Sequence, residues 1–168
     1  MAYLQEKLMK RIILPLLVAV FLAIGLQDSV SAHCEVPCGI YGDTLRFESM
    51  IEDHRTIQKA MAQIHALAGK ADAQSHNQLA RWVATKESHA TKTQHTIAQY
   101  FMSQRIKAKD PKYVAKLTTA HAVMVAAMKC KQNVDASHAN ALHAAIGAFY
   151  RAYEGRKLAA PEHGHEHK

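Results

Sequence analysis

Helix-type spacing of apolar residues is the feature that most limits the fold of this chain. Beyond Gly42 the sequence is rich in alanine and lacks the alternating runs of β-branched residues that are typical of strands. Four stretches carry apolar residues at steps of three and four, and short turns with helix-breaking residues separate them. The pattern predicts an all-α protein, an up-down-up-down four-helix bundle over residues 43–157.

Capping signals predict where the helices begin and end. The first helix is expected over 43–67, with Asp43 or Thr44 as its N-cap and Gly69 as its stop. The second is expected over 73–107. The third is expected over 111–131, with Pro111 at its first helical position. The fourth is expected to follow a cap at Asn133 or Asp135 and to run to about residue 156.

The apolar spacing also predicts which face of each helix is buried. The middle of the second helix, KESHATKTQH, is polar, so we expect its face to be only partly covered. The residues expected to face the core are Phe47, Met50, Ile51, Ile57, Met61, Ile64 and Leu67 in the first helix; Leu79, Trp82, Val83, Ile97, Tyr100 and Phe101 in the second; Val114, Leu117, His121, Met124 and Met128 in the third; and Leu142, Ile146, Phe149 and Tyr153 in the fourth.

Residues 1–32 have the organisation of a secretory signal peptide. A basic start is followed by the apolar run Ile12–Leu26 and by the small-residue stretch QDSVSA, which favours cleavage before His33. An uncleaved membrane anchor is the alternative, but the run is shorter than the roughly 20 residues that span a bilayer, and Pro15 interrupts it. We therefore expect a mature chain over 33–168, without a membrane segment after cleavage.

Charge and cysteine usage narrow the possible functions. The formal net charge is +7, and removal of residues 1–32 leaves +6. Dense Lys/Arg blocks interleaved with aromatic residues are missing, which argues against nucleic acid as a partner and leaves an anionic membrane surface or steering of a small anion. An odd number of cysteines, three, does not indicate a disulfide framework. Cys130 is expected to pack as a small apolar residue.

The stretch HCEVPC, residues 33–38, offers metal ligands once His33 is the amino terminus. The α-amine of His33 and the amide nitrogen of Cys34 close a five-membered chelate ring, and the Cys34 thiolate closes a second ring with the same amide. Cys38 supplies another thiolate, and Pro37 favours the turn that returns it to the metal. Two nitrogens and two sulfurs in a plane suit nickel(II) or copper(II), with the His33 imidazole available as an axial ligand.

Two other interpretations of the same residues remain open from spacing alone. Cys34 and Cys38 could close a small disulfide loop in a structural helical protein. Alternatively, they could belong to an exported protein that binds or delivers nickel, copper or zinc without turnover. The end of the chain, 158–168, is expected to be a flexible His-rich tail, whose histidines could bind metal weakly.

The motif H-C-x-x-P-C-G-x-Y resembles the nickel hook of nickel-containing superoxide dismutases. We refer to residues 33–42 as the hook. The resemblance extends over most of 33–157, and residues 77–107 look like the second helix of marine bacterial members. It implies a nickel-dependent enzyme that converts two superoxide anions to oxygen and hydrogen peroxide, a right-handed bundle, and a homohexamer with one nickel per subunit.

The resemblance also implies individual roles. His33 would give its amine and imidazole to nickel, Cys34 its amide nitrogen and thiolate, and Cys38 the second thiolate. The other implied site residues are the hook proline Pro37, the tyrosine Tyr41 beside the open face of the metal, Glu48 as the carboxylate that holds the histidine ring, and Tyr100 as a second active-site tyrosine. Because this chain begins with an export signal, we expect it to be periplasmic or secreted.

Overall fold

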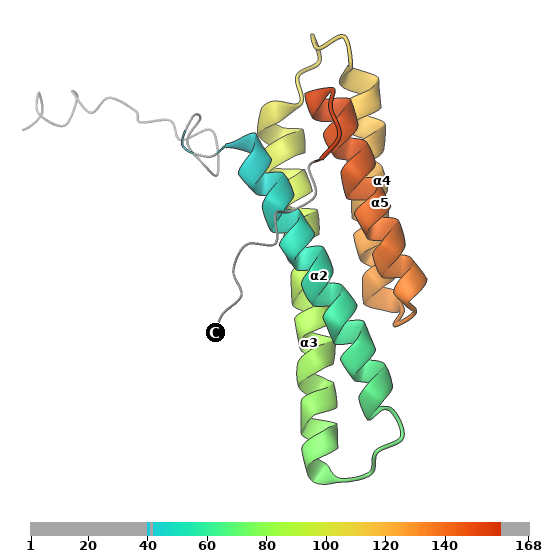
Figure 1. Ribbon diagram of the computed structural model, residues 1–168. Helices are drawn as coiled ribbons and strands as arrows, with labels where there is room; N and C mark the ends of the chain where they lie inside the picture. The colour runs from blue at the N-terminus through green and yellow to red at the C-terminus, as the bar shows by residue number, and fades with distance from the viewer. Residues whose placement is uncertain (1–39, 41, 159–168) are drawn as a thin grey trace, which may run out of the picture. The chain divides into compact units, whose positions relative to one another are not determined.

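The computed structural model describes residues 40 and 42–158, which are helical apart from turns and loops. Helix α2 covers Asp43–Leu67, α3 covers Ala73–His95, α4 covers Tyr113–Gln132 and α5 covers Ala136–Glu154. A π-helical segment, η1, covers Thr96–Arg105 and continues directly from α3. The α2–α3 and α4–α5 turns lie at one end, and the η1–α4 connection lies at the other (Figure 1). The predicted all-α, up-down-up-down four-helix bundle is therefore confirmed.

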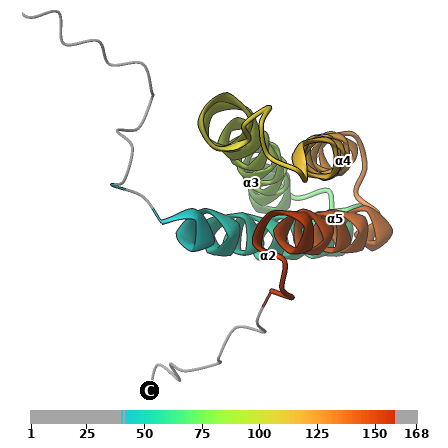
Figure 2. The same ribbon diagram turned by 90° about the horizontal axis from the view of Figure 1, so that it is seen from above.

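The helices pack as two adjacent pairs. Helix α2 packs against α3 and α5, and α4 packs against α5 and α3. Seen from above, α3 and α4 lie on one side and α2 and α5 on the other (Figure 2). The apolar faces of the four helices therefore meet in one shared core.

Most of the predicted helix ends are confirmed, because they depend on local chemistry. Gly69 and Gly155 adopt φ values of 85° and 77° just beyond α2 and α5, a conformation that favours glycine. The side chain of Asp72 caps α3 by accepting from the Ser75 amide at 2.9 Å. Asp135 caps α5 in the same way, accepting from the Ser137 amide at 2.7 Å.

The predicted start of α2 at Asp43 is confirmed, but its predicted N-cap is wrong, and so is the predicted start of α4. In both places an aspartate carboxylate makes other hydrogen bonds. The N-cap of α2 is Gly42, with extended backbone and no capping side chain, because the Asp43 carboxylate binds donors on other elements. Helix α4 begins at Tyr113 and not at Pro111. The Asp110 carboxylate accepts from the Lys112 amide at 2.7 Å, which holds Pro111 in the preceding turn.

Aromatic packing dominates the end of the bundle where α2 begins. The ring of Phe47 on α2 lies 4.8 Å from Phe101 on η1, and 5.1 Å and 4.9 Å from Phe149 and Tyr150 on α5, between centroids. Tyr153 is its fourth ring neighbour, at 5.7 Å. These tilted and edge-to-face contacts stabilise the core beyond simple burial. They join the first turns of α2 to η1 and α5.

The predicted inner stripe of α4 is only partly right: Leu117 and Met124 are half-buried and pack against the core, whereas the other three predicted residues do not. Val114 is 69% exposed, and His121 and Met128 are exposed as well. The face that packs into the core is formed mainly by small side chains: Ala120, Val123, Ala126, Ala127 and Cys130. Small residues let α4 approach its neighbours closely, so the helix buries alanines and leaves larger apolar residues outside. Val83 on α3, also predicted to face inward, is exposed.

A buried lysine explains how the polar middle of α3 is accommodated. Lys86 is only 2% exposed, and its Nζ donates to the carbonyl oxygens of Cys130, at 2.7 Å, and Lys131. These carbonyls lie in the last turn of α4, where no intrahelical donor is available and the helix dipole favours a cation. The same ammonium contacts the Glu87 carboxylate at 2.9 Å. Lys86 thus ties α3 to the end of α4.

Replacing Phe47 with alanine should destabilise the bundle strongly, because the ring is fully buried among four other rings. We expect the free energy of unfolding, measured by denaturant titration, to fall by about 3–5 kcal/mol. The matched control is Gln58→Ala on the same helix, where the side chain is exposed and the change should stay within about 0.5 kcal/mol. Equal losses in the two variants would contradict this placement of the core.

Candidate functional site

The hook lies almost entirely outside the described residues, which include only Ile40 and Gly42 of it. The predicted metal ligands in this part of the chain, and the predicted residues beside them, therefore stay predictions. They concern His33, Cys34, Pro37, Cys38 and Tyr41. The predicted tail is likewise outside, apart from Leu158.

The chain itself limits how far the hook can extend from the bundle. Cys38 precedes Asp43, the first residue of α2, by five positions. Five residues of fully extended chain span at most about 18 Å. Whatever conformation the hook takes, its second thiolate is tethered within that distance of Asp43. The surroundings of Asp43 are therefore the part of the bundle to which the predicted metal site is bound covalently.

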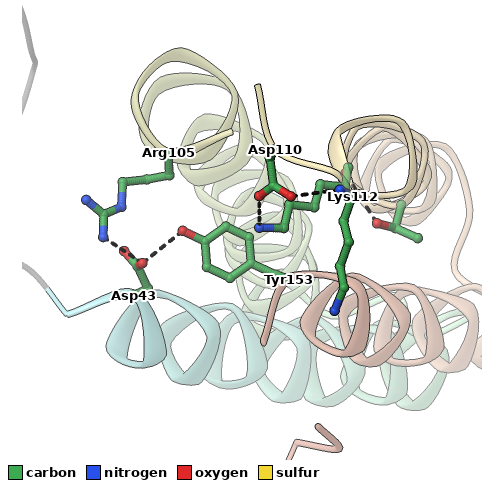
Figure 3. A network of polar contacts seen from close by, with 7 residues as sticks. Asp43, Arg105, Asp110, Lys112 and Tyr153 are labelled. Atoms are coloured by element: carbon green, nitrogen blue, oxygen red, sulfur yellow. Dashed lines mark hydrogen bonds and ion pairs between the residues drawn. The ribbon is translucent and has the colours of Figure 1, made fainter. Parts of the chain in front are cut away.

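Asp43 is the centre of a polar cluster at this end. Its Oδ1 accepts from the Tyr100 hydroxyl at 2.6 Å. Its Oδ2 accepts from the Arg105 guanidinium at 2.7 Å and from the Tyr153 hydroxyl at 2.8 Å. Figure 3 shows Arg105 and Tyr153 converging on the carboxylate from η1 and α5. We call Asp43, Tyr100, Arg105 and Tyr153 the Asp43 cluster.

The π-helical turn is what brings Tyr100 and Arg105 to the same carboxylate. The amide of Ile106 donates to the carbonyl of Phe101 at 2.8 Å, a bond between residues five apart. In an α-helix, residues three or four apart share a face, whereas Tyr100 and Arg105 are five apart. The wider π turn therefore aligns two side chains that a regular helix would separate. Such segments occur often at functional sites.

The contacts of the cluster fix its protonation. Burial alone would raise the pKa of Asp43, but hydrogen bonds from Arg105, Tyr100 and Tyr153 outweigh it and leave the pKa lowered. Burial, and then the bond to Asp43, raise the pKa of Tyr100 to about 12 and also raise the pKa of Tyr153. The bond to Asp43 raises the pKa of Arg105. Near neutral pH the cluster is therefore an ionised pair with two neutral phenols.

Glu48, the other predicted site residue among the described ones, has different neighbours. It is exposed on α2 and lines an open cavity of about 570 Å³ between α2 and α5, together with Arg55, His143 and Arg151. Tyr100, in contrast, is buried and contacts Asp43. The structure therefore groups Tyr100 with Asp43, and it places Glu48 on the side of α2 that faces α5.

Two members of the cluster had no predicted role, and Asp43 was assigned only as a helix cap. The spacing of Tyr100 and Arg105 matches no α-helical face, so helical periodicity gave no signal for Arg105. Tyr153 was expected only to face the core. A sequence signal did exist for Asp43: Gly42 before it could serve as the N-cap, which leaves the carboxylate available.

Within the part of the chain that the structure describes, the histidines and the buried thiol form no comparable site. His89 Nδ1 lies 2.6 Å from the Asp53 carboxylate. His54 stacks on His143 with ring centroids 4.9 Å apart, and burial, reinforced by His143, lowers the pKa of His54 to about 4. Among residues 40 and 42–158, no group of three or more His, Cys, Asp or Glu side chains could hold a metal ion.

Cys130 packs in the core as predicted. Its side chain is fully buried and its Sγ donates to the carbonyl of His138 at 3.3 Å. Burial raises the pKa of the thiol to about 11, so it stays protonated. None of the helices in the described part of the chain is both long and apolar enough to span a membrane.

Replacing Tyr100 with Phe should remove one phenol of raised pKa. The folded protein holds the hydroxyl proton of Tyr100 more tightly than the unfolded chain does. This difference therefore adds to the free energy of unfolding fully below pH 10, and the gain is lost as the pH rises to about 12. Ultraviolet titration of tyrosinate should show one fewer group ionising near pH 12 in the variant. Tyr113→Phe, outside the Asp43 cluster, is the control and should leave that step in place. If the group that disappears in Tyr100→Phe is instead one that ionises near pH 10, the raised pKa does not belong to Tyr100.

Comparison with known proteins tests whether the hook resembles that of nickel-containing superoxide dismutases because the chain belongs to that family. A protein-family model, described as nickel-containing superoxide dismutase, matches residues 28–157, a range that includes the hook and the four helices. Searches of the curated proteins and of the solved structures returned no match. The family match favours the enzymatic hypothesis over a metal-delivery or purely structural protein. The chain belongs to the nickel-containing superoxide dismutase family, and it is a nickel-dependent oxidoreductase that converts two superoxide anions to oxygen and hydrogen peroxide.

Proposed function

We propose that this superoxide dismutase binds its nickel at a new amino terminus, which cleavage before His33 creates. The observation that carries the proposal is the position of HCEVPCGIY directly after a signal-peptide-like segment. In the uncleaved precursor the His33 nitrogen is an amide and not an amine. Removal of residues 1–32 therefore supplies a ligand that the precursor lacks, and the family match includes the residues on both sides of the cut.

The donor set fits nickel by its chemistry. His33 offers an amine and an imidazole, Cys34 an amide nitrogen and a thiolate, and Cys38 a second thiolate. Nickel(II) accepts nitrogen and sulfur donors in a planar arrangement. Bound there, nickel supplies one-electron cycling between its divalent and trivalent states. Anionic sulfur and amide donors stabilise the trivalent state, which aqueous nickel reaches only with difficulty.

The rest of the chain orients the substrate and excludes water. The net positive charge of the mature chain favours the approach of the superoxide anion. Tyr41, three residues after Cys38, would guard the open side of the metal, and Glu48 would hold the His33 imidazole. Tyr100 has its own proton committed to the Asp43 carboxylate at 2.6 Å. It would therefore act as a fixed neutral phenol and not as a tyrosinate.

A homohexamer, implied by the family resemblance, is part of the proposal. Its support is the apolar surface near the hook: Ile40 is 66% exposed, and Leu45 and Val114 are exposed as well. Both Leu45 and Val114 lie in the first turn of their helices, and these two turns are at the same end of the bundle (Figure 1). Contacts between subunits at this end would cover these residues and shelter the hook.

The signal-peptide pattern supports export to the periplasm or beyond. In that compartment the amine ligand would appear only on cleavage during export. We therefore propose that nickel enters the site after the chain has crossed the membrane. The tail after Leu158, with its histidines, would remain in the mature enzyme.

A single residue added before His33 should abolish activity and leave the bundle folded, because it moves the amine away from the chelate. We expect superoxide consumption to fall by about a hundredfold or more, as expected when a reacting centre is misplaced. The circular dichroism spectrum should not change. The control carries the same extra residue after Lys168 and should keep full activity. Full turnover by the amino-terminally extended chain would rule out the amine as a ligand.

Replacing Cys38 with Ser should remove a soft donor that nickel requires. Nickel content and activity should both fall. Loss of a group that only hydrogen-bonds to a metal ligand costs roughly 10–100-fold, and loss of a ligand itself should cost more. Cys130→Ser is the matched thiol-to-hydroxyl control in the buried core, and it should retain nickel. Metal analysis alongside the activity assay separates the two variants. Equal nickel content in both would place the metal elsewhere.

A further inference from the structure

The first turn of α2 depends on the Asp43 carboxylate for its order. The first four amide groups of a helix have no intrahelical partner, and a capping side chain normally binds one of them. Gly42 provides no such side chain. Asp43 also turns its carboxylate away from its own helix and accepts from Tyr100, Arg105 and Tyr153. Tertiary contacts thus take the place of a cap where the hook joins the bundle.

These contacts connect α2 to the other elements at this end. Two donors come from η1 and one comes from α5, so the carboxylate joins three elements. The ring of Tyr153 in turn lies 4.5 Å from the Lys116 ammonium on α4, which pairs with Asp110 at 2.5 Å. Figure 3 shows Asp110 and Lys112 from the η1–α4 turn on the far side of Tyr153. A single carboxylate therefore fixes where α2 begins relative to the other helices.

The Asp43 carboxylate is mostly buried, so its hydrogen bonds are only weakly screened by water. The side chain of Asp43 is 17% exposed, and Tyr100 is buried. Hydrogen bonds to an ionised acceptor in such a site are short and comparatively strong. Loss of the charge would weaken the ion pair with Arg105 and the hydrogen bond that the Tyr100 hydroxyl donates. Both changes act on residues that contact Asp43, the residue that follows the hook in the sequence.

We propose that Asp43 is a positioning residue for the metal hook: its carboxylate holds the first turn of α2, from which the hook extends, in a fixed arrangement with Tyr100. This role rests on the proposed placement of nickel at His33, Cys34 and Cys38. Asp43 binds no metal and no substrate. It sets where the chelate stands relative to the phenol, and so it governs the rate per metal more than metal binding itself.

Asp43→Asn tests the role, because the side chain keeps its shape but loses its charge and one acceptor oxygen. Nickel content should stay near that of the parent, since the chelate forms within six residues of chain. Activity per bound nickel should fall about tenfold to a hundredfold, the scale expected for a misplaced reacting centre. Nickel release to a competing chelator should speed up. Amide hydrogen exchange should rise over residues 44–47 and not in the first turn of α5.

Asp72→Asn is the matched control. Asp72 also accepts from two donors at the start of a helix, from the amide and the hydroxyl of Ser75. It lies beyond the far end of α2, whose 25 residues are about 37 Å long. This variant should lose stability but keep its activity per nickel and its rate of nickel release. An equal loss of activity per nickel in both variants would attribute the effect to general destabilisation and overturn the proposal.

Tyr153→Phe provides a milder variant in case Asp43→Asn folds poorly. It removes one of the three donors, and a single hydrogen bond shifts an equilibrium by about two- to tenfold. A smaller fall in activity per nickel is therefore expected, in the same direction. If both Asp43→Asn and Tyr153→Phe stay within about twofold of the parent, with unchanged nickel release, Asp43 has no positioning role.

Measuring the parent protein in the same series tests the placement of nickel on the hook separately from the role of Asp43. A mature parent without nickel on the hook contradicts the placement of the metal, and the role of Asp43 falls with it. If the parent binds nickel and is active, and Asp43→Asn has the same activity per nickel and the same nickel release, only the positioning role is contradicted.

Discussion

The meeting of three donors on the Asp43 carboxylate is the interaction on which the functional end of this molecule depends. Tyr100, Arg105 and Tyr153 reach it from two different elements, and no side chain caps the helix that it begins. Without these bonds the first turn of α2 would lose three contacts that join it to η1 and α5. Because the hook continues directly from this turn, order at Asp43 becomes order at the root of the metal-binding segment.

Two parts of the core are packed differently: the end where α2 begins, and the inner face of α4. Where α2 begins, large rings from α2, η1 and α5 interlock around Phe47. Along α4 the buried face is mainly alanine, and larger apolar residues such as Val114 remain exposed. Interlocking rings resist small displacements because cores are close-packed. A rigid aromatic end where α2 begins suits an enzyme that, as proposed, must orient a short peptide chelate joined to that helix.

The sequence predicts well what local chemistry determines. Gly69 and Asp135 mark helix ends through backbone conformation and side-chain capping, and both predictions are confirmed. The face of α4 could not be predicted, because apolar periodicity weighs side chains by hydrophobicity, whereas close approach of helices selects alanine. Arg105 was missed because a π turn changes which residues share a face. The ligand predictions at His33, Cys34 and Cys38 come from covalent chelate geometry, which needs no tertiary information.

Metal binding and catalysis make different demands on this chain. In the proposed site, His33 and Cys34 close two chelate rings through neighbouring atoms, so this part of the chelate needs little help from the fold. Turnover requires more, because the substrate must meet the metal beside neutral phenols and away from bulk water. The π turn and the Asp43 cluster supply fixed orientation at the one point where peptide and bundle join. In this arrangement the four-helix bundle does not make the ligand set; it gives the ligand set a fixed place in which to react.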